Sequence, residues 1–71
     1  VCTDAACRAP YGALSHDSPH PRAYGTFGRF FRDYVRERRL LSLEQAVQKV
    51  TSLACDTFGL RGRGRVEEGA F

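Results

Sequence analysis

The sequence predicts a mainly α-helical chain that opens with a short strand and a long loop. Two helical signals support this class. Apolar side chains recur at helical spacing between residues 27 and 35, and a capping box opens another helix at Ser42. All three prolines lie between residues 10 and 21, which predicts an irregular segment. At 71 residues the chain holds one compact unit at most.

The N-terminal part is expected to be a strand followed by a loop. Residues 1–4 form a short β-leaning stub that ends at Asp4, and residues 5–25 are rich in turn-forming side chains. Pro19 and Pro21 disfavour helical backbone at the residues before them, so this part of the loop should run extended. Loops of this length without their own secondary structure are uncommon and are usually functional or disordered, so residues 5–25 are either a functional loop or a disordered one.

A first helix is expected over residues 26–38, with Thr26 as its N-cap. Its apolar side chains fall on one stripe, and charged residues fill the other face. The usual role of such a stripe is packing, and the chain has too few other apolar residues to cover it. The stripe consists of Phe27, Phe30, Phe31, Tyr34 and Val35.

The second half should hold two more helices and then a strand. Ser42 and Gln45 form the capping box of a helix over residues 43–53. A short helix should follow over residues 54–58, with Gly59 as its closing residue. Residues 61–71 have turn chemistry and then the beginning of a β-strand.

Composition excludes several classes of protein. No apolar run reaches the roughly 20 residues of a membrane-spanning helix, and no signal peptide is recognisable. Three widely spaced cysteines make a poor disulfide framework and favour a reduced, cytoplasmic chain. The net charge of +3 permits acidic partners without requiring nucleic acid. The sequence also lacks methionine, which suggests a piece of something longer.

The residues alone offer two weak candidate sites, one for zinc and one for nucleic acid. Cys2, Cys7, His16 and His20 could be drawn as a zinc set, but their spacing is shorter than in zinc fingers and prolines lie between them. The Arg-Gly-Arg-Gly-Arg tract at residues 61–65 could contact nucleic acid. It contains no aromatic residue, and such a tract is more often a solvated turn.

Several short motifs follow one another along the chain: His-Pro-Arg at residues 20–22, Tyr-Gly-Thr-Phe at 24–27 and a Leu-x-x-Glu-x-Ala-x-x-Lys pattern at 41–49. They continue through Phe-Gly-Leu at 58–60 and Gly-Arg-Gly-Arg-Val at 62–66. With these motifs the sequence resembles the N-acyl-D-amino-acid deacylase (D-aminoacylase) family of the amidohydrolase superfamily. The departures are Ala5 in place of glycine, and Gly28 and Ala54 in place of prolines.

The resemblance implies a fold context. Residues 1–60 would be the C-terminal end of a (β/α)8 metal-dependent hydrolase barrel, containing its last strand, an active-site loop and two to three helices. Residues 61–71 would begin the small β-domain. The rest of the barrel would be needed for packing.

The resemblance also implies roles for individual residues. Asp4 would be catalytic, taking a proton from a zinc-bound water and passing it to the leaving amine. It could also touch the metal, whose other ligands would lie outside these residues. Arg22 would hold the substrate α-carboxylate, since a guanidinium matches a carboxylate bidentately. His20 is a weaker candidate for substrate binding. Asp4 is expected to face a hollow, with a strand behind it.

The leading hypothesis is a C-terminal piece of a zinc-dependent hydrolase that cleaves N-acyl-D-amino acids to a carboxylate and a free D-amino acid. Alone, these residues should be inactive and bind no zinc. One alternative is a small helical module that binds protein or nucleic acid through its Phe stripe or Arg-Gly tail. Another is a degenerate reading frame that folds poorly.

Overall fold

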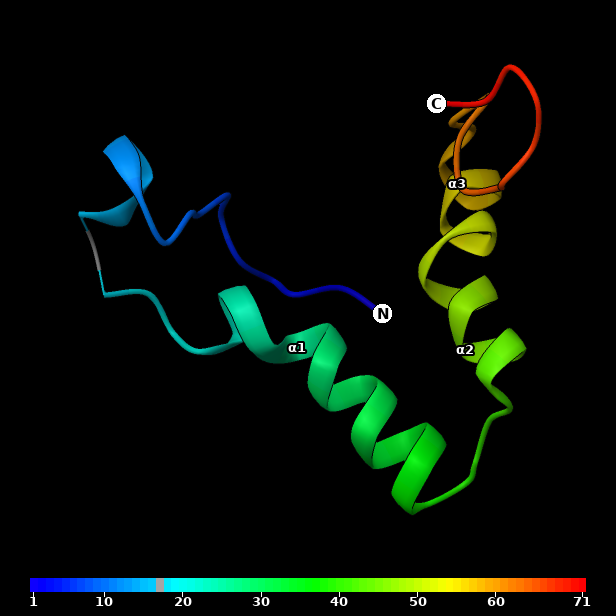
Figure 1. The fold of residues 1–71 in the computed structure, drawn as a ribbon, viewed down its shortest axis with the longest axis horizontal. Coiled ribbons are helices and arrows are strands. Elements are labelled where there is room, and N and C mark those ends of the chain that lie inside the picture. Colours follow the sequence, from blue (N-terminus) through cyan, green and yellow to red (C-terminus); the bar gives the residue numbers. More distant parts are fainter. Residues whose placement is uncertain (17) are drawn as a thin grey trace.

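The computed structural model describes residues 1–16 and 18–71; Asp17, in the expected loop, lies outside the described residues. The described part is helical and contains no strand, so the mainly α prediction is confirmed for it. Figure 1 shows two helical arms joined at one end, with the N-terminal segment beside the first arm. The elements are η1 (Gly12–Ser15), α1 (Arg22–Phe30), η2 (Phe31–Glu37), α2 (Leu43–Val50) and α3 (Ser52–Phe58).

The first helix begins earlier than its sequence predicts. α1 starts at Arg22, and Thr26 lies inside it, where its hydroxyl donates to the Arg22 carbonyl at 2.8 Å. The expected N-cap at Thr26 is therefore wrong. The start is set by Pro21, whose fixed φ suits the first turn and whose missing N–H needs no partner.

The helix continues into a wider π-helical stretch. In η2 the hydrogen bonds lengthen to i→i+5, and the Arg38 N–H donates to the Asp33 carbonyl at 3.0 Å. Asp33 also accepts side-chain hydrogen bonds from Arg29 at 3.0 Å and Arg32 at 2.7 Å. These bonds hold the pKa of the Asp33 carboxyl below its ordinary value, Arg32 contributing most. The rings of Phe30 and Tyr34 lie 5.9 Å apart, so the aromatic stripe persists into η2.

The second arm is divided differently from the prediction. Its capping box is confirmed: the Gln45 N–H donates to Ser42 Oγ at 3.2 Å, and the Ser42 N–H donates to Gln45 Oε1 at 3.0 Å. The helix ends at Val50 rather than at residue 53, because Thr51 leaves helical geometry with φ −128° and ψ −95°. α3 therefore begins at Ser52, and Gly59 closes it in the left-handed region as expected, with φ 68°.

Neither expected strand is formed. Residues 1–4 and 61–71 carry no β-ladder in the described chain. A strand needs a neighbour to take up its backbone hydrogen bonds, and the described residues offer none. The C-terminal residues instead fold back on themselves, with the Phe71 N–H donating to the Gly62 carbonyl at 2.9 Å. The division into a barrel end and a β-domain stays a prediction.

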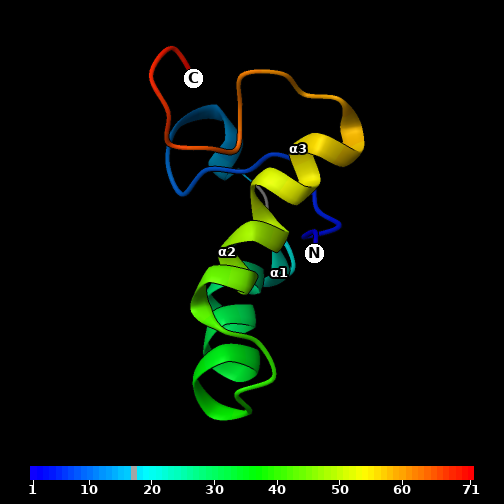
Figure 2. The ribbon, with the colours of Figure 1, turned by 90° about the vertical axis from the view of Figure 1, so that its right-hand side faces the viewer.

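The two arms share little core. α2 packs against η2 and α3, and the connection between the arms contains Arg39 in the left-handed region with φ 52°. Ala46 is the one buried hydrophobic residue among those described. Viewed from the side, the two arms overlap, with α2 in front of α1 (Figure 2). Phe27 and Tyr34 of the aromatic stripe stay about 40% exposed.

Candidate functional site

The structure brings together the two strongest site candidates. Arg22 Nη2 lies 4.0 Å from Asp4 Oδ2, which joins the N-terminal segment to the first residue of α1. The Asp4 side chain is 89% exposed and that of Arg22 is 50% exposed. An ion pair this open to solvent contributes at most about 1 kcal/mol, so its partners can exchange for a ligand at small cost.

The surroundings of Asp4 differ from expectation. It has no strand behind it, and its exposure means that the described residues form no hollow in front of it. Its backbone lies in the left-handed region with φ 51°, where the short Asp side chain is tolerated better than most. The walls that a catalytic carboxylate requires must therefore come from outside the described residues if Asp4 is catalytic.

His20 directly precedes Pro21, the N-cap residue of α1. Its Nδ1 accepts the backbone N–H of Arg22 at 3.1 Å. A small pocket of about 150 Å³ lies between the N-terminal segment and this end of α1. Arg8 also lines it, and because Arg8 lies in an irregular segment no motif or periodicity marks it as a site residue. The pocket lining is Ala5, Ala6, Arg8, Pro19, His20, Arg22 and Ala23.

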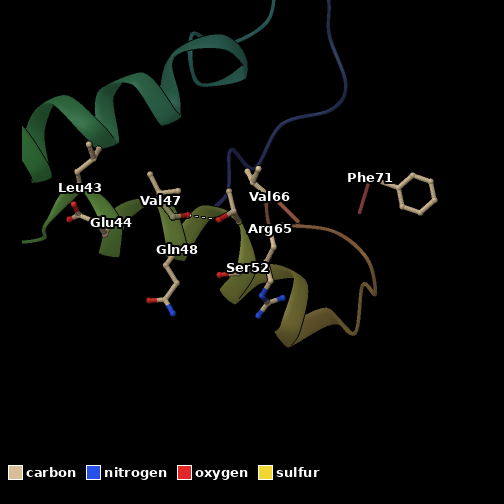
Figure 3. A pocket seen from close by; sticks show the side chains of 10 residues that line it. Leu43, Glu44, Val47, Gln48, Ser52, Arg65, Val66 and Phe71 are labelled. Carbon is tan, nitrogen blue, oxygen red and sulfur yellow. Dashed lines mark hydrogen bonds between the residues drawn. The ribbon is translucent and has the colours of Figure 1, made fainter. Parts of the chain in front are cut away.

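A larger pocket lies elsewhere. It measures about 690 Å³ and lies between α2 and the folded-back C-terminal residues. Figure 3 shows Val47 and Gln48 of α2 on one side and Arg65 and Val66 on the other. Asp4, His20 and Arg22 do not line it, whereas Gly64 and Arg65 of the Arg-Gly tract do. Its exposed surface is mostly apolar, although Glu44, Ser52 and Arg65 are among the residues that line it.

The Arg-Gly tract is engaged within the chain. Arg65 makes two hydrogen bonds to the Asp56 carboxylate, at 3.0 and 2.7 Å, and Arg63 stacks over the Phe71 ring at 4.3 Å. The bonds from Arg65 lower the pKa of the Asp56 carboxyl. Two of the three arginines therefore already have partners, which weakens the tract as a nucleic-acid surface.

The described residues do not by themselves fit a metal. No group of three or more His, Cys, Asp or Glu side chains lies close enough to hold an ion in the part of the chain that the structure covers. Catalytic zinc takes three protein ligands, and Asp4 alone falls short of that. Cys2 and Cys7 are exposed free thiols. None of the described helices is long and apolar enough to cross a membrane.

Comparison with known proteins shows which proteins the chain resembles. No family profile matches the chain, and no solved structure is similar to it. Three curated proteins of Alcaligenes xylosoxydans xylosoxydans are similar, with 47% identity over 66 residues to N-acyl-D-glutamate deacylase and 53% over 51 residues to N-acyl-D-aspartate deacylase. The third, D-aminoacylase, is 49% identical over 59 residues.

These relatives are all deacylases, which defines the class to which the chain is related. The matches cover 92%, 72% and 82% of this chain. Over most of its length the chain is therefore similar to part of the N-acyl-D-amino-acid deacylase family. It spans only 14%, 10% and 12% of the length of the three relatives.

Proposed function

We propose that these 71 residues are part of a hydrolase that cleaves the amide bond of N-acyl-D-amino acids to a carboxylate and a free D-amino acid. The observation that carries this is the identity of 47–53% to three deacylases over most of the chain. Two of these relatives, N-acyl-D-glutamate deacylase and N-acyl-D-aspartate deacylase, are named for acidic D-amino acids. We use the term parent protein for the longer protein that would contain this segment.

Arg22 is proposed to bind the substrate α-carboxylate. Its guanidinium is half exposed, and its neighbour Asp4 is the kind of group that a carboxylate ligand would replace. In an N-acyl amino acid the α-carboxylate carbon is three bonds from the carbonyl carbon that reacts. A substrate held by Arg22 therefore presents its scissile amide close to Asp4.

Asp4 is proposed to move protons in the reaction. Its carboxylate would take a proton from the attacking water and later give it to the leaving amine nitrogen. The water oxygen bonds to the acyl carbon as the C–N bond breaks, so the products are the acid and the free D-amino acid. Zinc is proposed for the parent protein, with its ligands beyond these residues.

The test uses the purified parent protein and N-acetyl-D-amino acids. Asp4→Asn should lower kcat by about 10²- to 10⁴-fold with little change in KM, the usual contribution of general acid–base catalysis. Arg22→Gln should lower kcat/KM by about 10- to 150-fold, as expected for losing a hydrogen bond to a charged group. Arg29→Gln is the matched control, because Arg29 lies on the same helix and pairs with Asp33.

If the Asp4→Asn and Arg22→Gln variants both kept wild-type activity, the roles assigned to Asp4 and Arg22 would be refuted. The 71-residue chain alone should release no D-amino acid, because it contains the proposed catalytic carboxylate of Asp4 but not the other groups that an active site needs. Measurable release by the isolated chain would contradict that part of the proposal.

A further inference from the structure

The first turn of α1 depends on His20 for its hydrogen bonds. A helix leaves its first N–H groups without intrahelical acceptors. Here Pro21 has no N–H, the Arg22 N–H donates to His20 Nδ1 at 3.1 Å, and the Ala23 N–H donates to the His20 carbonyl at 3.0 Å. His20 thus satisfies two consecutive donors, one with its ring and one with its backbone.

The backbone around His20 is restricted on both sides. Pro19 and Pro21 each have a fixed φ, and Pro21 further limits the conformations open to His20. The ring is thereby held where it can accept from Arg22, the first residue of α1. The same residue directs its guanidinium toward Asp4, 4.0 Å away.

We infer that His20 is a positioning residue, which fixes Arg22 for the substrate carboxylate by accepting its backbone N–H. The inference rests on the proposed function, and it replaces the expectation that His20 itself binds substrate. The bond requires that Nδ1 carry no proton, so the ring acts as an acceptor at Nδ1. Without this acceptor the first turn frays, and the guanidinium samples orientations that do not meet the carboxylate.

Two substitutions separate the acceptor from the shape of the ring. His20→Phe keeps a planar ring and removes the acceptor. His20→Asn supplies an amide oxygen that can accept an N–H two residues ahead, as Asn does at turns and helix starts. Each is made in the parent protein and again in an Arg22→Gln background, with the N-acetyl-D-amino acid that the wild type cleaves fastest.

His20→Phe should raise KM about 3- to 10-fold with kcat changed less than about twofold, the scale of one lost hydrogen bond. His20→Asn should restore KM to near the wild-type value. In the Arg22→Gln background His20→Phe should have no further effect, since the group that it positions is gone.

An equal loss from His20→Phe in both backgrounds would overturn the inference, because it would mean that His20 acts independently of Arg22. So would a His20→Asn variant as impaired as His20→Phe. A wild-type parent that releases no D-amino acid would overturn the proposed function together with this inference. An active wild type with either of the first two results overturns the inference alone.

Discussion

Gly64 should be intolerant of even a single added methyl group. It lies in the C-terminal segment with φ 79°, a backbone region that L side chains rarely adopt. A Cβ built on it would come 2.8 Å from Cys55 Sγ and 3.1 Å from the backbone Cα and N of Ser52. The contact is with the first turn of α3, so backbone as well as side-chain atoms would have to move.

The size of the effect follows from two contributions. Alanine in the left-handed region costs about 1–2 kcal/mol. Crowding in a packed contact adds typically about 1–3 kcal/mol. Gly64→Ala should therefore weaken the docking of residues 60–71 on α3 by about 2–5 kcal/mol. Gly69→Ala is a matched control, because Gly69 has φ 81° and nothing within 4 Å of a Cβ, so only the backbone contribution applies.

Trypsin cleavage after Arg65 measures the docking. When opening is fast relative to cleavage, the cleavage rate follows the population of the open segment. Each rate is divided by that of a short peptide of the same sequence, which removes the effect of the substitution on trypsin itself. Gly64→Ala should be cut about 5- to 150-fold faster than Gly69→Ala, the ratio that about 1–3 kcal/mol of crowding gives.

Equal corrected rates for Gly64→Ala and Gly69→Ala would refute the reasoning, since the crowding would then cost nothing. A third variant checks the cause. Adding Cys55→Ala to Gly64→Ala removes the Sγ contact and leaves the Ser52 contacts, so it should recover part of the loss.

Two further predictions concern single hydrogen-bonded pairs. Ser42→Ala should destabilise the start of α2 by about 1 kcal/mol, which gives roughly fivefold faster hydrogen exchange at the Gln45 amide. Ser42→Asp should keep that amide protected. Unchanged exchange in the alanine variant would contradict the role of the capping box. Hydrogen bonding to Arg65 lowers the pKa of the Asp56 carboxyl. The pair therefore stabilises the folded segment at pH values above the ordinary carboxyl pKa, and this stabilisation is lost as the pH falls through the lowered pKa. A carbon NMR titration should place the Asp56 midpoint below that of the same chain with Arg65→Gln, and coincident midpoints would argue against the pair.

Local signals in the sequence predicted the second arm well. The capping box at Ser42 and the closing glycine at Gly59 depend on neighbours within a few residues, and both form as expected. The break at Thr51 was not predictable in the same way. The residues there continue the apolar periodicity, and only the observed backbone angles show where the helix ends.

The start of α1 was missed because two N-terminal signals compete. Thr26 is a favoured N-cap residue, but Pro21 precedes it and His20 supplies acceptors for the first turn. A histidine ring as the acceptor is a signal that helix-start rules do not include.

The site was predictable only through resemblance. Asp4 and Arg22 were selected on family motifs, and the structure places them 4.0 Å apart. The expected strand before Asp4 and the hollow in front of it are not formed, because strands and pockets depend on residues distant in sequence. The roles of Asp4 and Arg22 are proposals, which variants of the parent protein test.

The π-helical stretch from Phe31 to Glu37 gives the chain a place that can absorb a change in length. A helix with i→i+5 bonds holds more residues in each turn than an α-helix. Removing one residue there can return the stretch to i→i+4 bonding and leave the register of the following residues close to what it is now. Leu43, which lines a pocket with Phe31 and Val35, would keep that place. A one-codon deletion in this stretch should therefore harm the chain less than the same deletion within α1, where it would rotate everything that follows by about 100°.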